Sequence, residues 1–157
     1  MFSITTVILA AGKSTRFKAA SSKLVYPLCG LPIISHVYAI AKKISGKKVV
    51  VVCNNENINE LKSILKDCVF VIQNQQRGTA DAIDQAKNKI NSKHVLVLFG
   101  DTPLITLSSI KKLIKKFLSS KAKASLIAFR TQKPFGYGRL LIKNNVFEEI
   151  IEEINLN

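Results

Sequence analysis

Short apolar runs alternate along the chain with longer segments in which apolar residues recur at helical spacing. The apolar runs predict buried strands at residues 7–10, 49–53, 69–72, 95–99 and 124–129. The amphipathic segments predict helices at residues 33–44, 57–65, 79–90 and 108–118, the last with Ser108 or Ser109 as its N-cap. Two final runs, 139–142 and 146–151, flank Asn144-Asn145 and predict a hairpin.

Strands and helices that alternate in this way predict an α/β fold with a mostly parallel sheet between layers of helices. In open α/β sheets, ligands bind outside the carboxyl ends of the strands. The loops that follow Ala10, Ile72 and Phe99 all carry polar residues that a plain connection does not need. We therefore expect these three loops to form a binding site.

Length and composition indicate one globular domain of 157 residues. No apolar run reaches the ~20 residues that a membrane-spanning helix needs, and the first residues lack the features of a signal peptide. Cys29, Cys53 and Cys68 are too far apart to match a disulfide framework or a zinc site. We therefore expect reduced thiols, a cytoplasmic location and no membrane partner.

The formal net charge of +14 raises the question of nucleic-acid binding. The 20 lysines and 4 arginines are spread along the chain, and the main cluster is Lys111-Lys112 with Lys115-Lys116 on one predicted helix. That distribution argues against nucleic acid as the main partner. A basic field suits a nucleotide or a sugar phosphate equally well.

The loop after the first strand, residues 9–17, has the sequence LAAGKSTRF. It lacks the glycines of a Walker phosphate loop and of a dinucleotide fingerprint. It resembles the signature loop of the sugar-phosphate nucleotidyltransferases, which wraps the base and triphosphate of a nucleotide. The resemblance implies that the nucleotide contacts Leu9, Ala10, Ala11 and Gly12 and that Lys13 and Arg16 act on its phosphates.

Residues 23–37, KLVYPLCGLPIISHV, are similar to the second block of the same family. The resemblance makes Lys23 the phosphate-binding lysine, a point charge that offsets negative charge on the α-phosphate. His36 lies within an apolar helical pattern, so we interpret it as a packed residue and not as a catalyst.

The third block, residues 73–82, has the sequence QNQQRGTADA and narrows the resemblance to the N-acetylglucosamine-1-phosphate uridyltransferases. In that family the leading glutamine and the Gly-Thr pair hold the uracil. These roles fall on Gln73, Gly78 and Thr79, whose amide and backbone groups can pair with a base. The Gly78-Thr79 pair is also an ordinary N-cap signal for the helix that follows.

The fourth block, FGDTPL, and the last block, FGYGRL followed by IIEE, complete the resemblance. Asp101 follows a buried strand and is the expected Mg²⁺ ligand, a hard carboxylate for a hard cation. The alternative is that Asp101 only caps the next turn. The family's sugar-binding positions fall on Gly138 and Glu152.

The family's reaction is uridylyl transfer, in which a sugar 1-phosphate attacks UTP and gives pyrophosphate and UDP-N-acetylglucosamine, a precursor of cell wall and lipopolysaccharide. Mg²⁺ is its expected cofactor. The resemblance implies the nucleotide-diphospho-sugar transferase fold. We expect residues 1–157 to form one such domain, incomplete at its C-terminus and without a left-handed β-helix acetyltransferase domain.

Two alternatives stay open at this point. The chain could be another nucleotidyltransferase of the same fold, acting on a different sugar, alditol or cofactor precursor. It could also be a truncated, non-catalytic remnant that at most binds nucleotide. The open strand edge expected after Ile151 makes self-association a further prediction.

Overall fold

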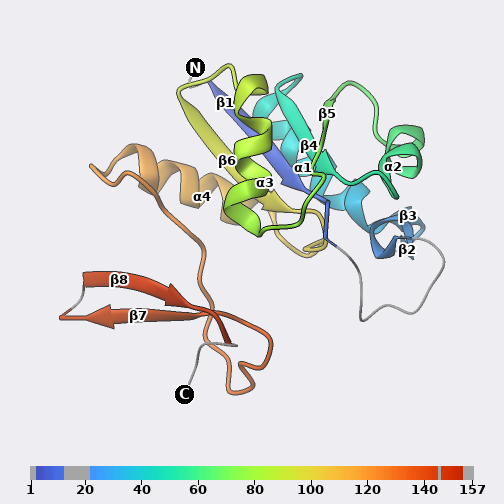
Figure 1. Cartoon of the computed structure of the whole chain (residues 1–157). Helices are drawn as coiled ribbons and strands as arrows, with labels where there is room; N and C mark the ends of the chain where they lie inside the picture. The colour runs from blue at the N-terminus through green and yellow to red at the C-terminus, as the bar shows by residue number, and fades with distance from the viewer. Residues whose placement is uncertain (1–2, 13–21, 145, 154–157) are drawn as a thin grey trace. The chain divides into compact units, whose positions relative to one another are not determined.

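The computed structural model describes residues 3–12, 22–144 and 146–153 (Figure 1). The chain divides into two compact units, Met1–Ile114 and Lys115–Asn157, and each is described by itself. No helix in the described ranges is both long and apolar enough to cross a membrane.

The first unit is built on a four-stranded parallel sheet. Its strands are β1 (Ile4–Leu9), β4 (Val49–Cys53), β5 (Val69–Ile72) and β6 (His94–Phe99). Their spatial order is β5-β4-β1-β6, and every pair in the sheet is parallel. The predictions of these four strands and of a parallel sheet are confirmed.

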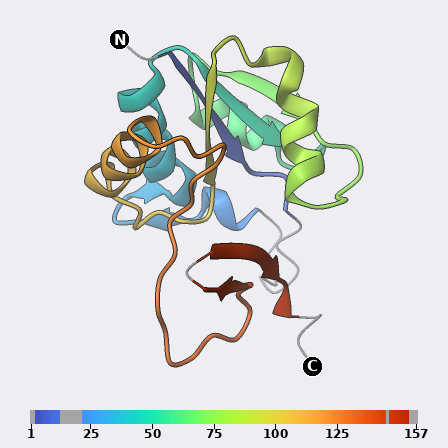
Figure 2. The ribbon, with the colours of Figure 1, turned by 90° about the vertical axis from the view of Figure 1, so that its left-hand side faces the viewer.

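Helices cover both faces of this sheet. They are α1 (Ile33–Ser45), α2 (Ile58–Ile64), α3 (Thr79–Ala86) and α4 (Leu107–Leu118). Alternate residues of β4 belong to two separate cores, since Val51 packs with Ile34 of α1 while Val52 packs with Ala82 of α3. Figure 2 shows α1 and α3 on opposite sides of the sheet, so the three-layer prediction is confirmed.

Both sides of β4 are therefore closed to water, which explains its unbroken β-branched sequence. All five residues of the strand are buried. Full burial of a valine side chain contributes about 1.5–3 kcal/mol to stability. The central strands therefore anchor the edge of the sheet from which the binding loops emerge.

The second unit contains an antiparallel hairpin of β7 (Arg139–Lys143) and β8 (Val146–Ile151). The hairpin prediction is confirmed, and a register shift between Leu141 and Ile142 interrupts the regular pairing. The strand predicted at residues 124–129 is wrong, because this segment is irregular. Its β-forming side chains Leu126, Ile127 and Phe129 are exposed, and strand propensity without a partner strand does not form a ladder.

Three local features of the first unit differ from the sequence-based expectations. The third helix ends at Ala86 and is followed by a 3-10 turn, Lys87–Lys89. Thr106 is the N-cap of α4, because its Oγ1 accepts a hydrogen bond from the Ser109 amide at 3.1 Å; Ser108 and Ser109 were the wrong caps.

The remaining difference is a short hairpin that the pattern did not predict. It joins β2 (Pro27–Leu28) to β3 (Leu31–Pro32) and follows a 3-10 turn, Lys23–Val25. Its two turn residues, Cys29 and Gly30, have φ angles of 51° and 81°. Two positive φ values in a two-residue connection are typical of a type I′ hairpin turn.

Candidate active site

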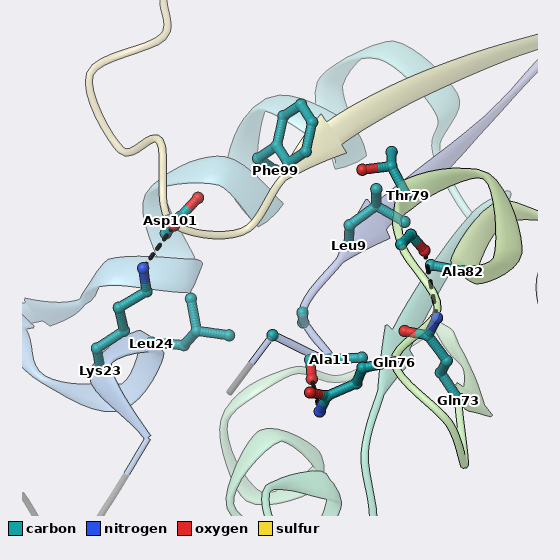
Figure 3. Close-up of a pocket in the computed structure, with 13 residues that line it drawn as sticks. Leu9, Ala11, Lys23, Leu24, Gln73, Gln76, Thr79, Ala82, Phe99 and Asp101 are labelled. Atoms are coloured by element: carbon teal, nitrogen blue, oxygen red, sulfur yellow. Dashed lines mark hydrogen bonds and ion pairs between the residues drawn. The ribbon is translucent and has the colours of Figure 1, made fainter. Parts of the chain in front are cut away.

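A pocket of about 320 Å³ opens at the carboxyl end of the parallel sheet (Figure 3). The loops after β1, β5 and β6 meet there, as the sequence predicted. The lining residues are Leu9, Ala10, Ala11, Gly12, Lys23, Leu24, Gln73, Gln76, Gly78, Thr79, Ala82, Phe99 and Asp101. The structure thus gathers Lys23, Asp101 and all seven residues predicted to bind nucleotide.

The position of the pocket follows from the strand order. From β1 the chain continues to β4 and β5 on one side, and β6 lies on the other side. The connections on the two sides of such a point diverge and leave a crevice between them, which is where open α/β sheets bind ligands. Gly100 permits a close approach here, because its N–H donates to the Leu9 carbonyl at 2.9 Å and an added Cβ would lie 3.2 Å from that oxygen.

Lys23 and Asp101 form an ion pair on the side of the pocket away from Gln73 (Figure 3). Lys23 Nζ donates to Asp101 Oδ2 at 2.6 Å, and the two side chains are 38% and 42% exposed. Lys23 begins the 3-10 turn that enters the short hairpin, whereas Asp101 follows Gly100 at the end of β6. The pair therefore brings a cation and an anion from distant parts of the sequence to one place in the site.

Gln73 lies on the opposite side of the pocket and is almost fully buried. Its Nε2 donates to Asp81 Oδ2 at 2.7 Å and to the Gly78 carbonyl at 3.3 Å. The hydrogen bond from Gln73, helped by the positive charge of Arg77, lowers the pKa of Asp81 against the opposing effect of desolvation. The Gln73 amide is thus held by an ionised carboxylate.

The loop after β1 is fastened by amide side chains that the sequence reasoning missed. Asn57 Nδ2 donates to the Ala10 carbonyl at 2.8 Å, and Asn54 Nδ2 donates to the Ala11 carbonyl at 3.1 Å. Gln76 Nε2 also donates to the Ala11 carbonyl, at 2.6 Å. Three asparagines in the four residues after a buried strand, Asn54-Asn55-Glu56-Asn57, were the available sequence signal.

A family model for the MobA-like NTP transferase domain matches residues 6–152. The chain belongs to this family. The matched range includes every described lining residue of the pocket.

Curated relatives are similar in sequence to nearly the whole chain. Bifunctional protein GlmU of Buchnera aphidicola subsp. Schizaphis graminum is 43% identical over 98% of the chain. The protein of the same name from Campylobacter fetus subsp. fetus is 37% identical over 100% of it. The alignments take in 33% and 36% of those proteins, so the chain spans about a third of their length.

Solved structures show the same fold. A putative glucose-1-phosphate thymidylyltransferase from Bacillus anthracis superposes with a TM-score of 0.85 over 96% of this chain and 65% of its own, at 20% identity. A CMP:2-keto-3-deoxy-manno-octonic acid synthetase superposes with a TM-score of 0.64 over 76% of this chain and 49% of its own. Because sequence identity to these structures is low, the superpositions show only that the strands and helices are arranged alike.

Members of this NTP transferase family typically use a divalent metal ion. The donors present fit such an ion when substrate supplies most of its ligands, because Asp101 places one hard carboxylate oxygen in the pocket. Among the residues that the structure describes, no group of three or more His, Cys, Asp or Glu side chains could hold a metal. Asp101 together with phosphate oxygens is the arrangement that this donor set allows.

Lys13 and Arg16 fall outside the described residues. Gly138 and Glu152 belong to the second unit and are neighbours there, since a Cβ added to Gly138 would lie 3.7 Å from Glu152 Oε2. His36 Nε2 lies 2.8 Å from the Leu28 carbonyl, which ties α1 to the short hairpin and agrees with its interpretation as a packed residue.

Proposed function

We propose that this chain is a nucleotidyltransferase domain that transfers UMP from UTP to N-acetylglucosamine 1-phosphate and releases pyrophosphate. One observation carries the proposal: nine residues that sequence resemblance assigned to nucleotide, phosphate and metal binding line a single pocket. The proposal treats residues 1–157 as one such domain. It places the protein in the cytoplasm, in keeping with the free thiols of Cys29, Cys53 and Cys68.

The proposed chemistry needs positioning and charge neutralisation but no side-chain nucleophile. An oxygen of the sugar phosphate attacks the α-phosphorus of UTP and forms a new P–O bond, while the bond to the bridging oxygen breaks and pyrophosphate leaves. Lys23 offsets negative charge on the α-phosphate, and the loop from Leu9 to Gly12 faces the nucleotide. A bound Mg²⁺ would offset the negative charge of the phosphates, and Asp101 would be its protein ligand.

The two ends of the pocket then take different parts of the nucleotide. Gln73, Gly78 and Thr79 surround the base, whereas Lys23 and Asp101 face the phosphates from the other side. Lys13 and Arg16 are assigned to the phosphates, and Gly138 with Glu152 to the acetylated sugar. These last four assignments rest on the sequence resemblance.

The direct test is pyrophosphate release by the full chain given UTP, N-acetylglucosamine 1-phosphate and Mg²⁺. We expect turnover, and we expect Lys23→Ala and Asp101→Ala each to lower it by roughly 100-fold or more. Lys93→Ala and Asp84→Asn are matched controls, because both side chains are exposed and outside the pocket. Pyrophosphate release no faster than the enzyme-free background would overturn the proposal. Faster release with CTP or with another sugar phosphate would identify that compound as the preferred substrate in place of the one proposed.

A further inference from the structure

We propose that Asp81 is a positioning residue that fixes the Gln73 amide with its oxygen toward the pocket, which selects uracil over cytosine. The inference rests on the proposed function only in that the pocket takes a pyrimidine nucleotide. Asp81 itself is not among the lining residues. It would act on the ligand only through Gln73.

The orientation of the Gln73 amide follows from the chemistry of its neighbours. One end of the amide lies between Asp81 Oδ2, at 2.7 Å, and the Gly78 carbonyl oxygen, at 3.3 Å. A carboxylate and a carbonyl only accept hydrogen bonds, so the NH₂ end must occupy this place. With the amide reversed, its oxygen would face two other oxygens at these distances.

Asp81 is itself held in place on the first turn of α3. Its Oδ1 accepts from Arg77 at 3.2 Å and from Gln85 Nε2 at 3.5 Å, which leaves Oδ2 for Gln73. The same neighbours lower its pKa, so the group is a carboxylate at neutral pH. The backbone of Gln73 is fixed as well, because its N–H donates to the Cys53 carbonyl at 2.8 Å.

The amide oxygen of Gln73 is left for a ligand. In Figure 3 it points toward the interior of the pocket. Among the described residues, no group donates a hydrogen bond to this oxygen. Every buried side-chain nitrogen or oxygen in the same residues has a partner, so this unpartnered oxygen is not buried. The oxygen therefore reaches the open space of the pocket as an acceptor.

A fixed acceptor distinguishes the two pyrimidines. Uracil carries an N–H at ring position 3 and can donate to the Gln73 oxygen. Cytosine has a bare nitrogen at that position, so two lone pairs would face each other and both groups would lose their bonds to water. An unsatisfied buried pair of this kind costs about 1–3 kcal/mol.

A purely structural role for Asp81 predicts a different result. An acidic side chain in the first turn stabilises a helix through its dipole, and its loss would lower thermal stability. It would leave the preference between two nucleotides unchanged. The ratio of the affinities for UTP and CTP therefore separates the two roles.

The test is a calorimetric titration of the full chain with UTP and with CTP, each with Mg²⁺, for the wild type and Asp81→Asn. Asparagine keeps the size of the side chain but can donate as well as accept, so the Gln73 amide is no longer held one way. We expect the wild type to favour UTP and Asp81→Asn to lower the UTP/CTP affinity ratio roughly tenfold. Asp84→Asn, on the same helix and paired with Lys87, is the control and should keep the wild-type ratio.

An unchanged ratio in folded Asp81→Asn would overturn the inference, and so would equal affinity of the wild type for UTP and CTP. Should Asp81→Asn not fold, Asp81→Ser removes the same charge and takes its place in the titration. A wild type that binds UTP but releases no pyrophosphate would refute the proposed transferase and leave the ratio to decide the role of Asp81. A wild type that binds neither nucleotide would overturn both.

Discussion

Lys23 Nζ lies 2.6 Å from Asp101 Oδ2, so the proposed phosphate-binding cation and the proposed metal ligand neutralise each other. The two residues are 78 positions apart in sequence and meet only because β6 ends beside the turn that holds Lys23. Phosphate groups of a nucleotide would compete with Asp101 for Lys23. A metal ion would compete with Lys23 for Asp101.

The first prediction concerns metal binding at this pair. Lys23→Met removes the cation that occupies the Asp101 carboxylate, so Mn²⁺ used as a probe should bind about two- to fivefold more tightly without nucleotide. Electron paramagnetic resonance of free Mn²⁺ measures this directly. Lys93→Met is the control, and unchanged or weaker binding by Lys23→Met would contradict the competition.

The second prediction concerns the loop after β1. Asn57 is buried. Its Oδ1 accepts a hydrogen bond from the backbone N–H of Asn54 at 3.1 Å, and its Nδ2 donates to the Ala10 carbonyl at 2.8 Å. Asn57→Ala should lower the free energy of unfolding by about 1–3 kcal/mol, because buried polar groups lose their partners. Urea denaturation gives the value, and exposed Asn55→Ala should change it by less than about 0.5 kcal/mol.

The third prediction concerns the hairpin of the second unit. A Cβ at Gly138 would lie 2.8 Å from Ile150 Cγ2, which is too close for two carbon atoms. Gly138→Ala should therefore weaken the β7–β8 pairing by about 1–3 kcal/mol, seen as faster amide hydrogen exchange in both strands. In an Ile150→Ala background the clash is gone, so the same substitution should cost little. A full cost in that background would refute the steric explanation.

The fourth prediction concerns thiol reactivity. Burial raises the pKa of Cys53 to about 11, whereas Cys29 is exposed in the short hairpin. Iodoacetamide at pH 8 should modify Cys29 first and reach Cys53 only after denaturant is added, as mass spectrometry would show. Equal labelling of Cys29 and Cys53 in the native state would contradict this prediction.

The raised pKa of Cys53 also affects the pH dependence of stability. The contribution of its protonated thiol to the free energy of unfolding is fully present below the ordinary thiol pKa, and it is lost as the pH rises toward 11.

Patterns that depend on one element at a time were predictable from the sequence. The β-branched run of β4 indicates a strand with both faces covered, and parallel strands bring their carboxyl ends to one edge, so the three binding loops could be expected to meet. The resemblance supplied the identities of Lys23, Gln73 and Asp101 as site residues. None of this required knowledge of distances.

Relationships between elements were not predictable in the same way. The Lys23–Asp101 pair and the amide contacts of Asn54, Asn57 and Gln76 depend on the relative placement of loops, which hydrophobic periodicity does not encode. The strand expected at residues 124–129 was wrong because propensity describes a segment, whereas a strand also needs a neighbour. Asp81 was not singled out from the sequence, because it does not line the pocket and reaches it only by its contact with Gln73.

Side chains from the segments after β4 and β5 hold the pocket loop that follows β1. Asn54 and Asn57 follow β4 and Gln76 follows β5, yet all three donate to carbonyls of the loop after β1. Loop-by-loop grafting is therefore a poor route to a new nucleotide preference in this scaffold. Replacing one loop alone would leave the carbonyls of Ala10 and Ala11 without the side-chain amides that donate hydrogen bonds to them. The segments that follow β1, β4 and β5 therefore have to be exchanged as a set.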